Sequence, residues 1–547
     1  LLDLDQGKRL HTEAQQKGFT SNLFVASTLV SMYGKCGDIG LAEIVFKDME
    51  VRDVAAWSGM LAAYINDGQG ERCLQLFRQM TEEGVDRYRL PFVSAVQACG
   101  ILAEDEKANA VRKNTSSNVA PIEIVRALHA DARRDGITTD VFIGSTLLNF
   151  YGKLGAIKEA EIACSEVSEC DVVAWTAMIS VYAEQGQGEK ALQLYRYMCL
   201  QGVCPNKLTF VFALKACGVL ADKEEAVLTE EECSIKSVSL QIGCAVHIDA
   251  RRKGLESDVL VGSMLVSMYG KCGAVIEAED AFKNLCERDV VSWTAMLSAY
   301  VKEGLGDKAL QFYKDMQKQH IALTDIALVS VLQACRGLGC LEIVRQLHFS
   351  TVSSWQDTSR LFANTLVHAY GTCASMNEAQ SVFDGLFEPD VVAWSACIAG
   401  YSQEGNCALC LRTFSRMLFA GIAPDRVAFL SLLSAFRHSG LVREALDIFG
   451  SMSRLHCLTP ALKHYAIMID LLGRAGNLKG VKMMLSGMPK QADMNILLGL
   501  LGACRTHGNL EMGKLVFRDA LHLQPLDATA YVLMSNLYAH TGLQEGE

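Results

Sequence analysis

The phrase Met-Tyr-Gly-Lys-Cys-Gly occurs twice in the chain, at residues 32–37 and again at residues 268–273. Alignment of the sequence on this phrase reveals four blocks of 31 residues, each ending in Asp: 23–53, 141–171, 259–289 and 360–390. Self-similarity at a fixed period of about 20–50 residues is typical of proteins in which one supersecondary unit is stacked many times. The repeat therefore decides the fold.

Two other types of block alternate with these. Blocks of 35 residues follow them, each with Trp at its fourth place: 54–88, 172–206, 290–324 and 391–425. A third type covers 89–140, 207–258 and 325–359, and its first two copies are 17 residues longer than the last. We place the two insertions near 104–120 and 221–237, in charged and polar segments. We interpret them as excursions from an otherwise regular loop, and we expect them to protrude.

Each block has the pattern of two short helices. In block 259–289 residues at helical spacing form one apolar face on each helix, namely Val261, Leu265 and Met268 on the first and Ala278, Phe282 and Leu285 on the second. Gly270 and Gly273 mark the end of the first helix. Helices of about 12 residues are marginal alone in water, so neighbouring repeats must bury these faces. The predicted fold is all-α: a right-handed α-solenoid superhelix of stacked helix-turn-helix repeats, with no sheet.

The composition excludes several other classes of protein. Apolar residues make up 50% of the chain, which excludes a disordered protein, and no run of apolar residues is long enough to predict a membrane span. The formal net charge of −11 excludes a surface that is basic all round, as in a non-specific DNA binder. The 20 cysteines recur with the repeat, as in Cys99, Cys217 and Cys335, so we interpret them as buried fillers in a reducing compartment. The four Trp residues at place four are assigned to the core.

Helical pairs of 31–36 residues that cycle through three lengths resemble the pentatricopeptide repeat family. The order of 35-residue P motifs, longer L motifs and 31-residue S motifs is similar to its PLS subclass. Val-Val-Ala-Trp-Thr-Ala-Met-Ile at 172–179 and the phrase at 462–476 are specific to the family, and the resemblance covers nearly the whole chain. It divides the chain into four segments: the end of an L-type repeat (1–22), tandem S, P and L repeats (23–493), a first E motif (494–527) and a truncated second E motif (528–547).

The resemblance implies binding of single-stranded organellar RNA, with one base read by each repeat. Unpaired bases expose their Watson–Crick edges, which short polar side chains can recognise by hydrogen bonds. In the family, the reading side chains stand at place five and at the last residue of each motif. The implied pairs are Ser27 with Asp53, Ser145 with Asp171, Thr176 with Asn206, Ser263 with Asp289, Asn364 with Asp390, and Ser395 with Asp425. A structural alternative stays open, because Ser and Thr inside helices commonly bond to their own backbone.

Other positions complete the implied interface. Place two is usually an aliphatic residue that wedges between bases, and here it is Phe24, Phe142, Val173, Leu260, Val291, Leu361 and Val392, with Ala55 as a weak exception. Ser58 and Thr294 occupy place five in motifs whose last residues, Tyr88 and Thr324, depart from the pattern. The L motifs carry Val93, Val211, Val329 and Leu430 at place five, which cannot hydrogen-bond to a base. The last S motif, with Ala466 and Asp493, is left open.

The family's code turns these pairs into an RNA sequence. It assigns guanine to Ser or Thr with Asp, adenine to Ser or Thr with Asn, and uracil to Asn with Asp. Read from 5′ to 3′, with n for an open place, the implied target is G-n-n-G-A-n-G-n-n-U-G-n-n. In an editing factor, the final n would lie four nucleotides before the edited cytidine.

Three functions are compatible with this pattern. The PLS order and the E motifs favour a factor that selects sites for cytidine-to-uridine editing in a mitochondrion or chloroplast, with the deaminase supplied by a partner or by a further C-terminal domain. An organellar splicing or stability factor would need the RNA binding alone. The third is a protein-binding scaffold like the tetratricopeptide solenoids. The acidic net charge of the chain favours this scaffold, but six of the acidic residues lie in insertion 221–237 and can lower the net charge without lining the groove. A targeting segment, if one exists, lies outside this sequence.

The sequence carries no complete catalytic motif. A deaminase zinc site needs His-x-Glu and Pro-Cys-x-x-Cys. His11 and Glu13 match the first in letters, and Cys407 and Cys410 match the second with Asn406 in place of Pro. His11 aligns with a repeat position, so we expect no zinc, no cofactor, no catalytic residue and no enzymatic activity.

Overall fold

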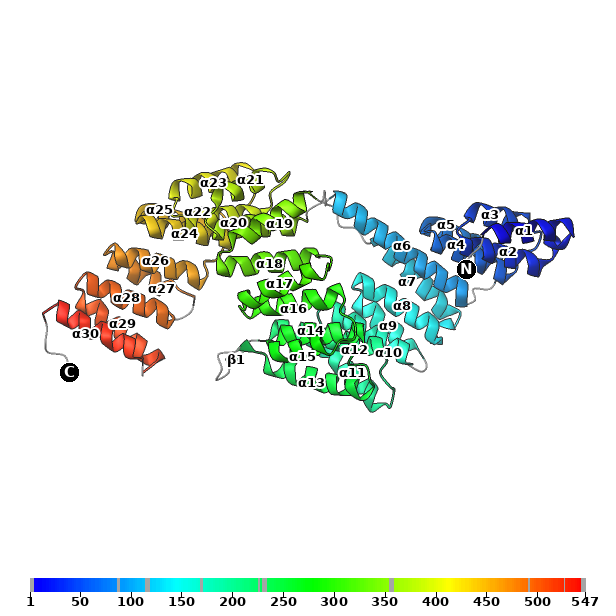
Figure 1. The fold of residues 1–547 in the computed structure, drawn as a ribbon, viewed down its shortest axis with the longest axis horizontal. Helices are drawn as coiled ribbons and strands as arrows, with labels where there is room; N and C mark the ends of the chain where they lie inside the picture. The colour runs from blue at the N-terminus through cyan, green and yellow to red at the C-terminus, as the bar shows by residue number, and fades with distance from the viewer. Residues whose placement is uncertain are drawn as a thin grey trace. The chain divides into compact units, whose positions relative to one another are not determined.

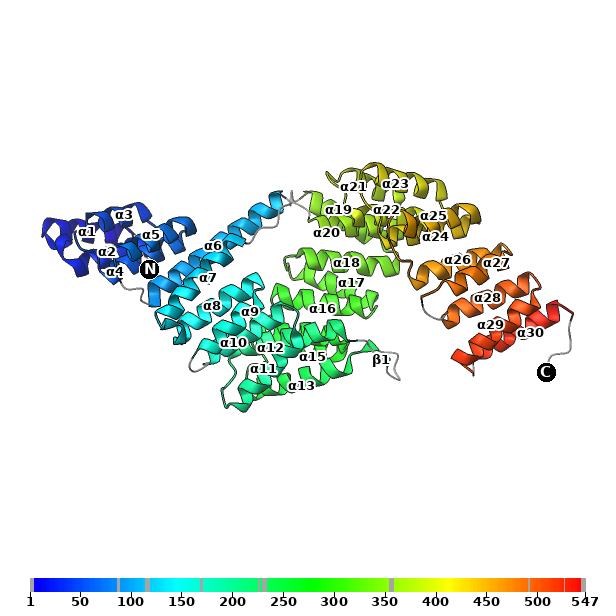
Figure 2. The ribbon, with the colours of Figure 1, turned by 180° about the vertical axis from the view of Figure 1, so that it is seen from behind.

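The computed structural model describes residues 4–85, 89–113, 119–167, 171–224, 227–228, 234–353, 359–489, 492–525 and 527–542. The chain divides into two compact units, Leu1–Ala299 and Tyr300–Glu547. Both units consist of short helices that pair into antiparallel hairpins (Figures 1 and 2). The prediction of an all-α solenoid is confirmed.

The elements of the first unit, with one helix that continues into the second, are α1 Leu4–Gln16, the 3-10 helix η1 Phe19–Ser21, α2 Leu23–Cys36, α3 Ile39–Asp48, α4 Val54–Asn66, α5 Gly70–Glu82, α6 Arg89–Lys113, α7 Val119–Arg134, the 3-10 helix η2 Ile137–Thr139, α8 Val141–Leu154, α9 Ile157–Glu166, α10 Val172–Glu184, α11 Gly188–Leu200, α12 Lys207–Lys223, β1 Val227–Leu228, β2 Ser234–Ile235, α13 Ser237–Arg252, α14 Val259–Cys272, α15 Val275–Lys283 and α16 Val290–Lys302.

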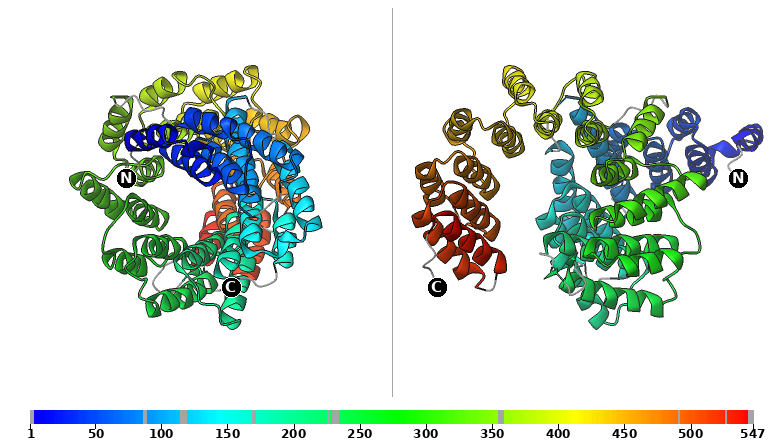
Figure 3. Two further views of the ribbon diagram at one scale, coloured as in Figure 1. Left: turned by 90° about the vertical axis from the view of Figure 1, so that its right-hand side faces the viewer. Right: turned by 60° about the vertical axis from the view of Figure 1, so that its left-hand side comes forward.

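The elements of the second unit are α17 Gly306–Lys318, α18 Asp325–Leu338, α19 Leu341–Ser353, α20 Arg360–Thr372, α21 Met376–Asp384, α22 Val391–Gln403, α23 Cys407–Phe419, α24 Arg426–Ser439, α25 Val442–Arg454, α26 Leu462–Arg474, α27 Leu478–Ser486, α28 Met494–Thr506, α29 Leu510–Leu523 and α30 Ala528–His540. Its last hairpins, from α24 to α30, follow one another in chain order (Figure 3, orange to red).

Local signals in the sequence explain where the first helices of the 31-residue blocks begin and end. α2, α8 and α14 follow an Asn or Asp whose side chain accepts backbone N–H groups of the first turn: Asn22, Asp140 and Asp258. Each of the three helices ends at a glycine with positive φ: Gly37, Gly155 and Gly273. The predicted boundaries of these helices therefore have a capping residue at both ends.

The first helix of each hairpin packs on the first helix of the next. In the first unit α2 contacts α4, α4 contacts α6, and the series continues to α14, while second helices such as α3, α5 and α11 each contact the first helices on either side of them in the chain. Of the predicted core Trp residues, Trp57, Trp293 and Trp394 are buried, whereas Trp175 is partly exposed and stands 5.6 Å from the ring of Tyr197. The predicted stripe of Val261, Leu265 and Met268 is buried as well. The core is thus a continuous layer between neighbouring hairpins.

The two insertions differ from the predicted loops. The first continues α6 as helix through Lys113, because its sequence is rich in Ala, Glu and Lys, which are strong helix formers; residues 114–118 lie outside the described part. The second contains β1 and β2, which pair antiparallel over two residues each, where the sequence predicted no strand. Leu285 is a smaller difference: it is buried as predicted, but α15 ends before it, at Lys283.

Gly270 also differs from its predicted role, because it lies inside α14 and does not end the helix. A Cβ there would come within 2.6 Å of the Cβ of Ala299, so the glycine allows two first helices to approach closely. Gly34 has the same relation to Ala63, again at 2.6 Å. A larger side chain at either position would force the two helices apart.

We therefore expect Gly34→Leu to lower the free energy of unfolding by about 1–3 kcal/mol, the usual cost of overpacking. Thermal unfolding followed by circular dichroism measures this directly. Gly100→Ala is the matched control, since a Cβ at that helical glycine would meet no atom within 4 Å and alanine favours the helix. Equal melting temperatures for Gly34→Leu and the wild type would contradict the close-packing role.

Candidate nucleic-acid interface

Three motifs join their place-five side chain directly to the side chain of their last residue. The Ser263 hydroxyl lies 2.9 Å from Oδ1 of Asp289 and 2.6 Å from the carbonyl of Val259, and either oxygen can accept its single proton. The Ser395 hydroxyl donates to Oδ1 of Asp425 at 2.8 Å, and Nδ2 of Asn364 donates to Oδ1 and Oδ2 of Asp390 at 3.0 and 3.1 Å. All three donors are buried. The structure therefore brings the members of these three predicted pairs together.

Two further pairs are arranged differently. The hydroxyls of Ser27 and Ser145 donate to the backbone carbonyls of Phe24 and Phe142, at 3.2 and 3.1 Å. This is the backbone bonding that Ser commonly makes inside helices. Their predicted partners, Asp53 and Asp171, accept N–H groups of the following helix, and among the described residues no hydrogen bond joins them to Ser27 or Ser145.

Helix capping accounts for the residue type at the end of each motif. The last residue is the N-cap of the next first helix, and its side chain accepts N–H groups of the first turn: Asp53 from Ala56, Asp171 from Val173 and Ala174, Asp289 from Ser292, Asp390 from Ala393, and Asp425 from Ala428. Capping favours Asp, Asn, Ser or Thr at this position but imposes nothing on place five. The cap gives the place-five side chain a partner whose orientation is fixed by the backbone.

Thr176 and Asn206 are linked through a third side chain. The Thr176 hydroxyl lies 2.6 Å from the hydroxyl of Thr209, and the Thr209 hydroxyl donates to Oδ1 of Asn206 at 3.0 Å. The sequence pattern did not identify Thr209, because it belongs to the next motif.

The remaining place-five residues take other positions. Ser58 is half-buried, and its predicted partner Tyr88 lies outside the described residues. The Thr294 hydroxyl donates to the carbonyl of Val290 at 2.7 Å. In the L motifs Val93 and Val329 are buried, and Val211 and Leu430 are partly buried.

The place-two side chains form a series of exposed apolar groups. Those predicted from the S and P motifs are between 47% and 78% exposed: Phe24, Phe142, Val173, Leu260, Val291, Leu361 and Val392. The L motifs extend the series with four residues that the sequence analysis missed: Leu90, Leu208, Ile326 and Val427. The shared offset from the start of each motif would have found them. Exposed aliphatic side chains at one register indicate a contact surface, because the core has no need of them.

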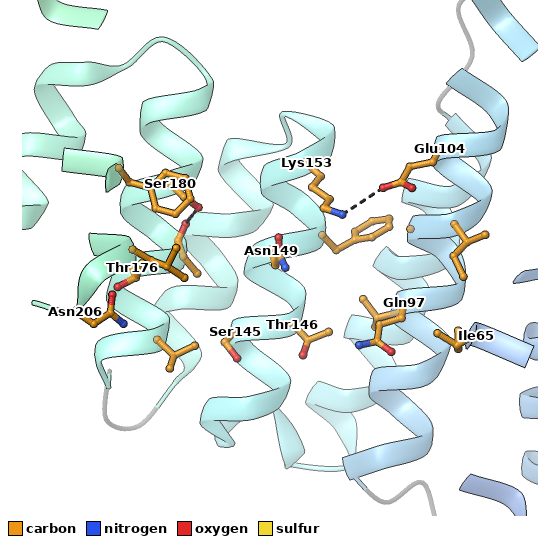
Figure 4. Close-up of a pocket in the computed structure, with 18 of the residues that line it drawn as sticks. Ile65, Gln97, Glu104, Ser145, Thr146, Asn149, Lys153, Thr176, Ser180 and Asn206 are labelled. Carbon is orange, nitrogen blue, oxygen red and sulfur yellow. Dashed lines mark hydrogen bonds and ion pairs between the residues drawn. The ribbon is translucent and has the colours of Figure 1, made fainter. Parts of the chain in front are cut away.

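In the first unit these positions meet in one groove. α4, α6, α8, α10 and α12 line a groove of about 820 Å³, which includes Ser145, Val173, Thr176, Asn206 and Leu208 (Figure 4). Place-two and place-five side chains of successive motifs thus share one continuous surface. The groove combines apolar side chains with a few hydroxyl and amide groups, as ligand sites in proteins do.

Ion pairs flank this surface where the L motifs carry insertions. Lys153 pairs with Glu104 at 3.3 Å, and Lys271 pairs with Asp222 at 2.7 Å at the equivalent positions (Figure 4 shows the first pair). The L motif at 325–359, which has no insertion, has Cys340 at the place of the acid, and Thr372 follows at the place of the lysine. The pairs therefore accompany the insertions.

A second repeated ion pair occupies the last residue of the same L motifs. Arg89 pairs with Asp140, and Lys207 pairs with Asp258 at 2.7 Å. Burial acts to raise the pKa of Asp258, but Lys207, by its hydrogen bond and charge, and the backbone N–H groups of Val261 and Leu260 together outweigh it and hold the pKa below its ordinary value. These carboxylates are already neutralised within the protein. The sequence pattern gave no sign of the pairs, because the two residues are 51 positions apart.

The candidate zinc residues have structural partners. His11 lies 2.9 Å from the hydroxyl of Tyr33, and the same His–Tyr contact recurs in the later L–S junctions, as between His247 and Tyr269 at 2.7 Å. Cys410 is buried, and burial raises the pKa of its thiol to about 12, which opposes the thiolate that zinc requires. Within the described ranges, His, Cys, Asp and Glu side chains form no cluster of three or more that could hold a metal ion. Nor does any described helix have the length and apolar character of a membrane span.

Comparison with known sequences assigns the repeat. Models of the PPR repeat family match residues 171–218 and 288–336, those of the PPR repeat match 24–54, 55–85, 263–290 and 427–457, and that of the pentatricopeptide repeat domain matches 380–438. A chloroplastic pentatricopeptide repeat-containing protein of Arabidopsis thaliana is 31% identical over 99% of this chain and 58% of its own length. A mitochondrial one from the same plant is 31% identical over 99% of this chain and 74% of its own length.

Solved structures share the fold. The maize pentatricopeptide repeat protein PPR10 superposes with a TM-score of 0.50 at 17% identity, over 98% of this chain and 79% of PPR10. PPR10 in complex with an 18-nucleotide psaJ RNA element gives a TM-score of 0.54 at 16% identity, over 95% and 84% of the two chains. From the length and identity of the match to the mitochondrial relative, this chain belongs to the pentatricopeptide repeat family.

Proposed function

We propose that this chain binds single-stranded RNA along the surface formed by places two and five, with one base per motif. The observation that carries the proposal is the recurrence of a hydrogen-bonded pair, place five with the last residue, beside an exposed apolar side chain at place two. Apolar side chains can pack against the faces of unstacked bases, while the polar pair meets their edges. PPR10, which shares the fold, has been solved with a bound RNA element.

One orphaned atom supports the assignment of a base to its motif. Asn364 donates through Nδ2 to Asp390, and its Oδ1 is buried with no hydrogen-bond partner among the described residues. An unsatisfied buried acceptor costs about 1–3 kcal/mol, which a ligand that donates to it would recover. Uracil carries a donor at N3, whereas cytosine carries an acceptor there. The N3–H of uracil would supply the donor that Oδ1 of Asn364 lacks.

We further propose that the RNA targets are sites of cytidine-to-uridine editing in a mitochondrion or chloroplast. The cycle of S, P and L motifs over 23–493 and the E motifs at 494–527 and 528–547 support this assignment, and the curated relatives include chloroplastic and mitochondrial proteins. α28 begins at Met494 and α30 at Ala528, as expected if each E motif opens with a first helix. The deaminase would be supplied by a partner that docks through the E motifs or by a further domain.

Selection of RNAs from a random pool by the purified chain tests the binding. The expected consensus is G-n-n-G-A-n-G-n-n-U-G-n-n, with the letters of the three bonded pairs (the seventh, tenth and eleventh) most strongly enriched. A chain that enriches no RNA but captures a defined peptide would instead be the protein-binding scaffold. An RNA consensus that occurs at splice sites or transcript ends, and not upstream of edited cytidines, would favour the splicing or stability factor.

A further inference from the structure

Thr209 differs from the residues at the equivalent place in the neighbouring motifs. It is the third residue of its motif, in the first turn of α12, and its side chain is fully buried. The third place is alanine in five other motifs, again fully buried: Ala56, Ala174, Ala327, Ala393 and Ala428. The core therefore needs only a methyl group at this position.

The hydroxyl of Thr209 completes a capping box with Asn206 at the start of α12. Ser292, at the third place of motif 290–324, also carries a buried hydroxyl, but it donates to the backbone carbonyl of Asp289. What sets Thr209 apart is its contact with the place-five hydroxyl of Thr176.

The hydroxyl of Thr209 uses its full hydrogen-bonding capacity. It lies 2.6 Å from the Thr176 hydroxyl, donates to Oδ1 of Asn206 at 3.0 Å and accepts the backbone N–H of Asn206 at 3.2 Å. A hydroxyl has one proton and two acceptor sites. The one arrangement that satisfies all three contacts has the proton of Thr209 on Asn206 and the proton of Thr176 on Thr209. The oxygen of Thr176 is then left as an acceptor.

The same network sets the orientation of the Asn206 amide. Its Oδ1 accepts both the backbone N–H of Thr209 at 2.9 Å and the Thr209 hydroxyl at 3.0 Å, so both acceptor sites of this oxygen are filled. The Nδ2 group therefore carries the donors that remain for a ligand. Thr176 and Asn206 both line the groove, where they present an acceptor and a donor side by side (Figure 4).

We propose that Thr209 is a positioning residue that sets the hydrogen-bonding polarity of motif 172–206, and thereby its choice of adenine over guanine. This inference rests on the proposed function. Adenine presents an amino donor beside the acceptor N1, whereas guanine presents the acceptor O6 beside a donor N1–H. An acceptor at Thr176 and a donor at Asn206 match adenine and oppose guanine in the same pose. The motifs with Ala at the third place have no group that could impose this polarity.

Binding of the intact chain to RNAs that differ only at the fifth nucleotide tests the inference. The wild type should prefer adenine to guanine there. Thr209→Val keeps the size of the side chain, and Thr209→Ala reproduces the neighbouring motifs, so both should fold. Each should reduce the preference by about fivefold, the factor that one hydrogen bond typically contributes. Thr209→Ser keeps the hydroxyl and should retain the preference.

An internal control separates this role from general damage. The preference for uracil at the tenth nucleotide, assigned to Asn364, should not change in any Thr209 variant. A wild type that discriminates at the tenth nucleotide, with an unchanged adenine preference in Thr209→Val, would overturn the role of Thr209 alone. Loss of the preference in Thr209→Ser as well would do the same. A wild type that discriminates at no nucleotide would overturn the proposed function together with this inference.

Discussion

Ser395→Asn should change the base selected by its motif from guanine to uracil. The substitution recreates a pair that the chain already contains, because Asn364 makes two hydrogen bonds to Asp390 from the equivalent position of another first helix. Both place-five side chains are buried to a similar degree, at 3% and 6% exposure, so the two environments are comparable. A mismatched hydrogen bond costs about 1–3 kcal/mol, so the ratio of affinities for the two bases should shift by roughly tenfold or more.

The reciprocal substitution tests the same assignment in the opposite direction. Asn364→Ser should convert its motif from uracil to guanine, and the double variant should exchange the two letters while the total affinity for its new target stays close to that of the wild type. Thr365→Asn is the control for the introduction of an asparagine into a first helix. Residue 365 is next to place five of its motif, and the Thr365 hydroxyl donates to the carbonyl of Leu361 in its own helix. Fluorescence anisotropy with four RNAs, one for each combination of letters, measures all variants. Unchanged preferences in both single variants would refute the assignment of place five.

Much of the fold could be predicted because the same local sequence signals recur in successive motifs. The Asn or Asp before α2, α8 and α14, the glycine after each of them and the apolar stripe within them are local signals, and the structure has helices where these signals predict them. For the fourth block of 31 residues, Ser359 and Cys373 take the two capping positions of α20. The extension of α6 was missed for a related reason. A polar insertion between two helices was interpreted as a loop, although its Ala, Glu and Lys residues favour helix.

The candidate site was less predictable, because it depends on residues that are distant in sequence. Place five and the last residue follow from the motif length, and in three of the six pairs the structure places the two side chains within hydrogen-bonding distance. The ion pair of Lys207 with Asp258 joins the two ends of one long motif. The contact of Thr209 with Thr176 joins two different motifs. Hydrophobic periodicity has no bearing on such contacts, since they arise only when first helices stack side by side.

Val173→Asp combined with Leu208→Asp should reduce RNA affinity by at least tenfold. Both side chains line the groove and are about half exposed, at 51% and 50%, so the fold does not depend on them. The substitutions remove two apolar surfaces that would pack against bases. They also place two negative charges beside the RNA backbone, where each should oppose binding most strongly at low salt.

A control on the second helix of the same hairpin distinguishes contact from surface charge. Leu200→Asp changes an equally apolar and even more exposed side chain, at 73% exposure, that belongs to α11 and does not line the groove. It should leave RNA affinity within about twofold of the wild type at moderate ionic strength, because a charge beyond a Debye length of about 10 Å is largely screened. The melting temperatures of both variants should remain close to that of the wild type. If Leu200→Asp weakened binding as much as the groove variant, the loss would reflect net charge, and the place-two residues would not be the surface on which the RNA lies.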